Sequence, residues 1–296
     1  MKHCLLRGID EKKRSNYLIL LLLIISIFFI IWTLWGNKAL EVNEITIASS
    51  RIPSAFSGFR IAQVSDLHNA EFGEDNAMLL KMLSGCAPDI IVITGDLVDA
   101  NHTDIDVALA FAEEAVWIAP TYYVTGNHEA SSSEYDTLKT GLESAGVIIL
   151  EDEIVYLEQD GETIALLGLD DPNFTIKGDI FSEVLAMVST KINNMHKQNT
   201  TYSILLSHRP ELFETYVASG IDLVLSGHAH GGQFRLPFIG GLIAPNQGLF
   251  PRYDAGLFTD DNTNMIVSRG LGNSIIPIRF NNRPEIVLIE LHTDNN

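Results

Sequence analysis

Five short motifs in this sequence combine the side chains that proteins use to bind divalent transition metals. They are Asp66-Leu-His68, Gly95-Asp96-Leu-Val-Asp99, Gly126-Asn127-His128-Glu129, the isolated His208, and Gly227-His228-Ala-His230. Carboxylate oxygens and imidazole nitrogens together suit Mn, Fe or Zn ions. Two such ions about 3.5–4 Å apart, sharing a carboxylate, can hold both the attacking and the leaving oxygen of a phosphoryl displacement. The motifs therefore predict hydrolysis of a phosphorus ester or anhydride by a metal-bridging hydroxide.

Each motif directly follows a run of residues that is typical of a buried β-strand. The predicted strands are Phe59–Val64, Asp89–Thr94, Thr121–Val124, Tyr202–Ser207 and Leu223–Ser226. Predicted helices alternate with them at Asp75–Ser84, Asp104–Ile118, Glu134–Ala145 and Glu211–Ala218. Since the carboxyl ends of strands form the ligand-binding edge of an α/β sheet, we expect all five motifs at one edge. Glycines before Asp96, Asn127 and His228 allow the tight turns that aim these side chains.

The remainder of the chain predicts shorter strands. Ile154–Leu157 and Thr163–Leu167 flank a Gln-Asp-Gly turn, which predicts a hairpin. Two further strands are expected at Met265–Ser268 and Glu285–Leu291. The Gly- and Pro-rich stretch Gly231–Pro251 could be a lid, a lipid-binding flap or a plain loop, and the sequence leaves these open.

Taken singly, each motif also has an ordinary structural interpretation. A histidine after a strand is often a surface or satisfied buried residue, and acids at strand ends often cap the next helix. Asp99 in particular could be such a cap. It is the ordered set of five motifs, each after an apolar strand, that favours a metal site.

The same motifs resemble those of the calcineurin-like metallophosphoesterase superfamily, over the chain from Phe59 to Gly231. The continuations Gly231–Pro237 (GGQFRLP) and Ile278–Ile286 (IRFNNRPEI) resemble the membrane-anchored bacterial branch, which includes enzymes that act on UDP-diacylglucosamine. The resemblance implies an α/β (α+β) fold, a four-layer αββα sandwich of two mixed β-sheets. It also implies two divalent metal ions as cofactors.

The resemblance also implies a role for each motif residue. Three side chains would bind the first metal ion: Asp66, His68 and His230. Three would bind the second: Asn127, His208 and His228. Asp96 would bridge the two ions. His128 would contact the phosphate and help protonate the leaving oxygen, and Asp99 would orient His128 by accepting its other N–H.

One part of the family pattern is missing, because no arginine directly follows the Gly126–Glu129 motif. Other arginines would have to contact the substrate phosphate, and the candidates are Arg209, Arg235 and Arg269. Arg209 adjoins His208, although a surface salt bridge is an equally good interpretation of its position.

The N-terminal region predicts a membrane anchor. Tyr17–Trp35 contains no charged residue and, as a helix, spans roughly 28 Å, close to one hydrocarbon core. A cleaved signal peptide and a buried core helix are the alternatives. Lys12, Lys13 and Arg14 directly before it place the N-terminus in the cytoplasm by the positive-inside rule. We therefore expect a single-pass protein of the cell membrane with four parts: a basic cytoplasmic segment (1–16), a transmembrane helix (17–35), a linker (36–50) and an extracytoplasmic phosphoesterase domain (51–296).

Charge narrows the substrate class. The chain has a net charge of −19, made of +4 over residues 1–38 and −23 over the remainder. A domain with this much negative charge repels polynucleotides, which are also negatively charged. We therefore expect no nucleic-acid partner, and a nuclease is only a third alternative. We expect a small-molecule or lipid-linked substrate at the bilayer, cleaved at a phosphodiester, pyrophosphate or phosphomonoester bond.

Two further interpretations stay open. A UDP-2,3-diacylglucosamine pyrophosphohydrolase would act on the cytoplasmic face, which conflicts with the orientation expected from Lys12–Arg14. A non-catalytic metal-binding interaction protein would keep the fold, but it should have lost some of the seven ligands. The sequence does not determine the oligomeric state.

Overall fold

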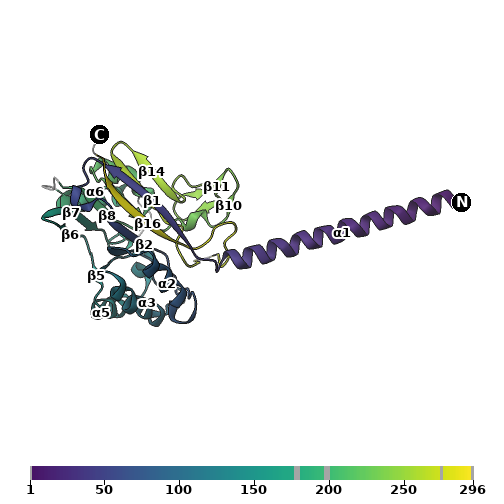
Figure 1. The fold of residues 1–296 in the computed structure, drawn as a ribbon, viewed down its shortest axis with the longest axis horizontal. Helices are drawn as coiled ribbons and strands as arrows, with labels where there is room; N and C mark the ends of the chain where they lie inside the picture. The colour runs from purple at the N-terminus through teal and green to yellow at the C-terminus, as the bar shows by residue number, and fades with distance from the viewer. Residues whose placement is uncertain (1, 177–180, 197–200, 274–275, 295–296) are drawn as a thin grey trace.

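The computed structural model describes residues 2–176, 181–196, 201–273 and 276–294. Two mixed, six-stranded β-sheets form the centre of the domain (Figure 1). The first has the order β1 (Glu41–Ser49), β16 (Glu285–Thr293), β2 (Arg60–Val64), β3 (Ile90–Thr94), β4 (Thr121–Val124) and β5 (Ile148–Ile149). The second has the order β14 (Gly256–Asp260), β15 (Thr263–Val267), β9 (Leu223–Ser226), β8 (Ser203–Leu206), β7 (Glu162–Gly168) and β6 (Glu153–Gln159).

Four neighbouring strands run parallel to one another in each sheet. In the first sheet, β2 to β5 run parallel, β16 is antiparallel to β2, and β1 is parallel to β16. In the second sheet, β7, β8, β9 and β15 run parallel between the antiparallel edge strands β6 and β14. Strands buried on both faces need apolar side chains throughout, which explains the continuous apolar runs seen in the sequence.

Helices cover the two outer faces of the paired sheets. One apolar cluster joins the first sheet to three helices: α2 (Ala77–Gly85), α3 (Ile105–Ile118) and α5 (Tyr135–Ala145). A second cluster lies between the sheets and contains Val92, Leu166 and Leu225. A third joins the second sheet to α6 (Phe181–His196) and α7 (Phe213–Ala218). These layers confirm the predicted four-layer αββα sandwich.

Short elements complete the fold. The 3-10 helices are Ser54–Phe56, Glu74–Asn76, Pro172–Phe174, Pro210–Leu212 and His230–Gly232, and the one-turn helix α4 is Asn127–Ser131. Two small hairpins follow β9: β10 (Arg235–Leu236) with β11 (Gly240–Gly241), and β12 (Ile243–Ala244) with β13 (Gly248–Leu249).

The five strands predicted before the motifs all form, with ends shifted by at most one residue. The predicted hairpin is the antiparallel pair β6 and β7. The linker expected over residues 36–50 is wrong for most of its length, because β1 pairs with β16 from Glu41 to Ser49. The folded domain therefore includes residues well before position 51.

The N-terminal helix α1 (Lys2–Gly36) projects away from the sheets (Figure 1). Its segment Arg14–Gly36 is long and apolar enough to cross a membrane, and its most apolar window is not covered by the rest of the chain. The end of the helix is attached to the domain. The Asn37 side-chain amide donates to the Arg279 carbonyl over 2.8 Å, and the Arg283 guanidinium lies 5.1 Å from the Trp35 ring centroid.

Candidate metal centre

The five motifs meet where the carboxyl ends of five strands come together between the two sheets. The first sheet contributes residues that follow β2, β3 and β4, and the second contributes residues that follow β8 and β9. The side chains so placed are Asp66, His68, Asp96, Asn127, His208, His228 and His230.

Four of these side chains form a first group that could hold a metal ion: Asp66, His68, Asp96 and His230. One ligand atom of each lies within 4.8 Å of the others. His68 Nε2 lies 3.6 Å from Asp96 Oδ2 and 3.2 Å from His230 Nε2. His230 Nε2 lies 3.4 Å from Asp66 Oδ1. Two carboxylates and two imidazoles thus converge on one small volume.

Asp96 also belongs to a second group, with His208 and His228. Its Oδ2 atom lies 3.0 Å from His208 Nε2, and that nitrogen lies 3.2 Å from His228 Nδ1. Asn127 Oδ1 is buried and has no hydrogen-bond partner within the described part of the chain. A buried amide oxygen without a donor is costly, so this atom fits the role of a metal ligand.

The histidines of the first group carry no proton charge at neutral pH. Burial lowers the pKa of His68 to about 4 and that of His230 to about 3. Neutral imidazoles keep the lone pair that a metal ion needs.

His208 behaves differently because it faces Asp96 directly. Burial opposes a charge on its ring, but the Asp96 carboxylate raises the pKa of His208 to about 10. Its Nδ1 donates to the Thr94 carbonyl over 2.7 Å, which leaves Nε2 directed toward Asp96. The position favours positive charge, and a metal ion bound there would displace the proton.

The backbone of the candidate ligands is strained. Five of the seven residues have left-handed φ angles: Asp66 (52°), His68 (46°), Asp96 (54°), His228 (66°) and His230 (48°). Non-glycine residues in this region cost on the order of 1–3 kcal/mol each and gather at functional sites. The strain turns the side chains of successive motifs toward a common centre.

Two glycines allow the motifs to approach each other. A Cβ atom at Gly126 would collide with Asp96 Oδ1, and one at Gly227 would collide with Ser65 Oγ and Asp66 Oδ2. The glycines before Asn127 and His228 are therefore required for close packing against the carboxylates, whereas the predicted left-handed turn is found at Gly95 (φ 88°).

The structure corrects the expected pairing of Asp99 with His128. Asp99 Oδ2 lies 3.9 Å from His128 Nδ1, which is too far for a hydrogen bond. The backbone N–H of Ala100 donates to this nitrogen instead, over 2.9 Å. In the neutral ring the proton must then be on Nε2, because Nδ1 is the acceptor. His128 is also anchored through its own backbone N–H, which donates to Asp96 Oδ1 over 2.9 Å.

Asp99 Oδ2 lies at almost the same distance from Nδ1 of His68 and from Nδ1 of His128, but the His128 nitrogen already accepts from Ala100. Its Oδ2 atom is 3.8 Å from His68 Nδ1, a buried nitrogen without a hydrogen-bond partner in the described residues. Its Oδ1 atom accepts from the backbone N–H of Asn101 over 2.8 Å. This turn-forming contact is close to the helix-cap alternative considered for Asp99.

Among the three candidate arginines, the structure brings Arg209 to the cluster. Its guanidinium is buried, forms a two-pronged ion pair with Asp171, and lies 3.2 Å from His228 Nε2. Arg209 and Asp171 thus form a buried ion pair and not a surface salt bridge.

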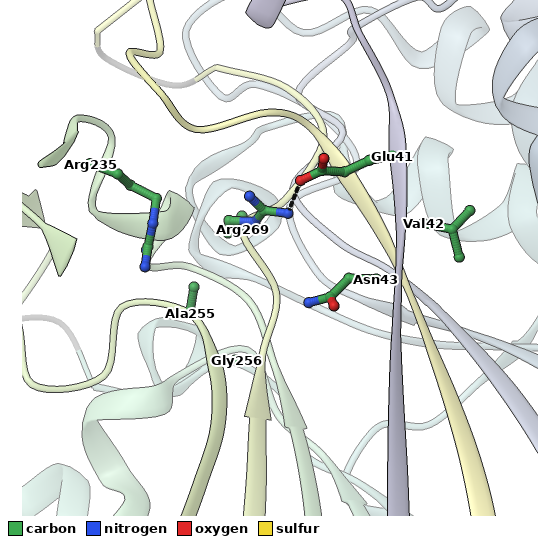
Figure 2. A pocket seen from close by; sticks show the side chains of 7 residues that line it. All are labelled: Glu41, Val42, Asn43, Arg235, Ala255, Gly256 and Arg269. Carbon is green, nitrogen blue, oxygen red and sulfur yellow. Dashed lines mark hydrogen bonds and ion pairs between the residues drawn. The ribbon is translucent and has the colours of Figure 1, made fainter. Parts of the chain in front are cut away.

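Arg235 and Arg269 line a different pocket, together with Glu41, Asn43 and Gly256 (Figure 2). Arg235 donates to Asp254 and to the Gly231 carbonyl, and Arg269 pairs with Glu41 and Glu285. The pocket contains none of the seven candidate ligands. The expectation that Arg235 contacts the phosphate is therefore not supported.

Two residues that shape the site were missed at the level of sequence. Glu129 is fully buried and accepts the backbone N–H groups of Asp96 (2.9 Å) and Gly126 (2.7 Å). Burial and the nearby Asp96 carboxylate raise the pKa of Glu129 to about 7. Arg279 is also buried, with its guanidinium 3.4 Å from His230 Nδ1 and donating to the Arg269 carbonyl over 2.6 Å. Glu129 lies in the motif Gly126–Glu129 and Arg279 in the segment Ile278–Ile286, but the partners of both side chains are seen only in the folded structure.

Comparison with known proteins agrees with this geometry. The family profile of calcineurin-like phosphoesterases matches residues 59–232. The chain is 31% identical to the metallophosphoesterase YkuE of Bacillus subtilis, over 86% of this chain and 87% of that protein. It is 27% identical to the phosphodiesterase YaeI of Escherichia coli, over 79% and 82%. It is 28% identical to a bovine transmembrane protein with metallophosphoesterase domain, over 92% of this chain and 62% of that protein. The chain belongs to the calcineurin-like phosphoesterase family and is a phosphoester hydrolase.

Proposed function

We propose that this hydrolase holds two divalent metal ions in the two groups of side chains, with Asp96 shared between them. The observation that carries the proposal is the position of Asp96 Oδ2, which lies within 3.6 Å of ligand nitrogens from both groups. The unpartnered Asn127 oxygen supports it. The ions would supply positive charge that lowers the pKa of a bound water and offsets the negative charge developing on the phosphoryl oxygens.

The chain's own residues then have separable tasks. In the neutral ring of His128 the proton is on Nε2, because Ala100 donates to Nδ1, so Nε2 can donate a hydrogen bond to the leaving oxygen and stabilise its developing charge. Arg209 is held by Asp171 beside His228, so one edge of its guanidinium can donate to a phosphate oxygen. Asp99 orients His68 in this account.

The proposed substrate is a lipid-linked phosphodiester. An apolar cavity of about 330 Å³ lies directly beside the metal centre, with His230 in its wall next to Ile243, Ala244 and Ile276. An alkyl chain suits such a lining, and a charged nucleotide does not. The name of the Escherichia coli relative, a phosphodiesterase, favours a diester over a monoester.

The proposed location is the outer face of the cell membrane. An apolar N-terminal helix and relatives described as transmembrane proteins indicate membrane anchoring. Lys12, Lys13 and Arg14 before the apolar segment support a cytoplasmic N-terminus and an extracytoplasmic domain.

A substrate panel tests the proposal. The Mn-loaded full-length enzyme in detergent would be assayed against p-nitrophenyl phosphate, bis(p-nitrophenyl) phosphate, a nucleotide pyrophosphate, UDP-2,3-diacylglucosamine and p-nitrophenyl esters of phosphatidic acid. We expect the highest kcat/KM for the phosphatidyl diester. Preference for UDP-2,3-diacylglucosamine would favour the pyrophosphohydrolase, and absence of all turnover would contradict the assignment of an active hydrolase.

A further inference from the structure

Two segments of the domain expose large apolar side chains and contain no acidic residue. These segments are Gly231–Tyr253 and Gly270–Pro284, and neither contains Asp or Glu in a chain that has 38 of them. Among their described residues, the large apolar side chains that are exposed are Phe238, Ile239, Ile243, Leu249, Phe250 and Ile278. Single exposed apolar residues are ordinary, but a group of this kind marks an interaction surface.

The two segments form one surface. Phe234 and Phe280 make a β-bridge, and the backbone N–H of Arg235 donates to the Phe280 carbonyl over 2.9 Å. The Gln233 side-chain amide donates to the carbonyls of Ile276 (2.8 Å) and Ile278 (2.7 Å). The hairpin β10–β11, which carries Phe238 at its turn, lies on the side of the domain from which α1 leaves (Figure 1).

This surface is continuous with the apolar helix. Ile278 lines a pocket together with Phe29, Ile30 and Leu34 of α1, and the Phe29 and Phe280 rings are 6.3 Å apart. Phe29 lies seven residues before the end of the helix, at Gly36, which corresponds to about 10 Å along its axis. The segment around Ile278 therefore lies beside the apolar part of α1, where a spanning helix is already within the bilayer.

We propose that the six exposed apolar residues form a membrane-docking face that enters the interfacial region of the lipid bilayer. The lipid surface is the partner that fits, because α1 places Ile278 at membrane depth and the remaining five residues share its surface. The absence of Asp and Glu from the two segments also favours a lipid surface as the partner. Residues 39–296 carry a net charge of −23, which anionic lipids repel, whereas the two segments themselves contain no acid. Three of their arginines, Arg235, Arg252 and Arg283, are paired with acids on neighbouring elements.

Docking would bring the apolar cavity to the membrane. Ile243 of the docking face and Ile276 next to it line the same cavity as His230. A lipid-linked substrate could then pass from the bilayer to the metal centre without exposing its alkyl chain to water. The docking face itself rests on surface chemistry and does not depend on the proposed substrate.

Spin labels on the full-length protein test the face directly. Cys4 is replaced by Ser, the buried Cys86 is kept, and one cysteine is introduced at Phe238, Leu249 or, as a control, Trp117 on α3, which is 86% exposed. The protein is reconstituted in vesicles of phosphatidylcholine and phosphatidylglycerol. Power-saturation EPR should show that labels at positions 238 and 249 collide with O₂ more than with a water-soluble nickel chelate, and the label at 117 the reverse. Water-like collision rates at both 238 and 249 would overturn the proposal.

Kinetics give a second, independent readout. In Phe238→Asp/Leu249→Asp, α1 still holds the enzyme on the vesicle, but the docking face no longer enters the bilayer beside the cavity. The KM for a vesicle-borne phosphodiester should therefore rise about tenfold or more, roughly the factor that burial of one large apolar side chain contributes. Turnover of soluble bis(p-nitrophenyl) phosphate should be unchanged, and the matched variant Trp117→Asp should change neither. An unchanged KM in the double variant would contradict docking. If no phosphoester is cleaved by the wild type, the proposed function fails while the EPR result still decides the docking face.

Discussion

The Oδ2 atom of Asp96 lies 3.0 Å from Nε2 of His208, at the point where the two groups of candidate ligands meet. The carboxylate is fixed by the neighbouring motif, because its other oxygen accepts the backbone N–H of His128 and the Asp96 N–H donates to Glu129. A single side chain thus connects both groups and His128, the proposed hydrogen-bond donor to the leaving oxygen. This arrangement allows metal binding and stabilisation of the leaving oxygen to be separated by mutation.

His128→Ala should retain the metals and lose rate. Because His128 is proposed to donate a hydrogen bond to the leaving oxygen and not to bind metal, kcat with an alkyl leaving group should fall by about 10²–10³. The loss should be much smaller with p-nitrophenol, which leaves without protonation. Steady-state kinetics on the two esters checks this, and metal loss in the purified variant would instead identify His128 as a ligand.

Asp99→Asn should weaken metal binding more than it weakens the contact between His128 and the leaving oxygen. Asp99 Oδ2 lies near Nδ1 of His68, so its removal should reduce metal affinity by about 10–100-fold, the usual effect of losing a carboxylate behind a ligating histidine. Metal titration followed by activity measures the change. Excess metal should restore most of the rate. If saturating metal restores nothing while the leaving-group dependence changes, Asp99 acts through His128 after all.

Arg209→Met should destabilise the fold through its partner. The substitution leaves the buried Asp171 carboxylate unpaired, which costs about 3–5 kcal/mol of unfolding free energy. Denaturant unfolding in detergent measures this. In the matched double variant Arg209→Met/Asp171→Leu most of the stability should return, while KM stays high because the phosphate contact is lost. A wild-type KM in that double variant would exclude Arg209 from substrate binding.

The orientation in the membrane gives a prediction of its own. A cysteine at Trp117, in the Cys4→Ser background, should react with a membrane-impermeant maleimide in intact spheroplasts if the domain is extracytoplasmic. The same position should be labelled to the same extent after lysis. Labelling that appears only after lysis would place the domain in the cytoplasm and favour the UDP-2,3-diacylglucosamine reaction.

Local patterns predicted the strand ends well and long-range pairings poorly. Buried parallel strands such as Ile90–Thr94 are continuous β-branched runs, and the motifs that follow them are visible in sequence. The strand Glu41–Ser49 was missed, because its partner β16 lies at the opposite end of the chain and its own residues are mostly exposed or half-buried. Pairing of this kind depends on the assembled sheet and not on local propensity.

In the candidate site, too, the residue types were predictable from the sequence and the contacts between distant residues were not. All seven ligand candidates were visible as residue types after strands, but the partner of His128 was not, because the backbone N–H of Ala100 carries no residue-specific information. The buried positions of Arg279 and Glu129 likewise depend on packing. Arg235 was chosen for its charge and motif, and the structure pairs it with Asp254 in another pocket.

Asp96→Asn tests the shared ligand. Replacing one carboxylate oxygen by an amide removes the charge that both groups use, so we expect loss of metal and of turnover together. Asp106→Asn, which changes an exposed acid on α3, is the matched control and should behave like the wild type.

The most direct measurement is the metal-to-protein ratio of the Mn-loaded, desalted full-length protein by elemental analysis. We predict about two ions per chain in the wild type and in Asp106→Asn, and a clearly lower ratio in Asp96→Asn. One ion or none in a fully active wild type, or two ions and full activity in Asp96→Asn, would contradict a two-metal site bridged by Asp96.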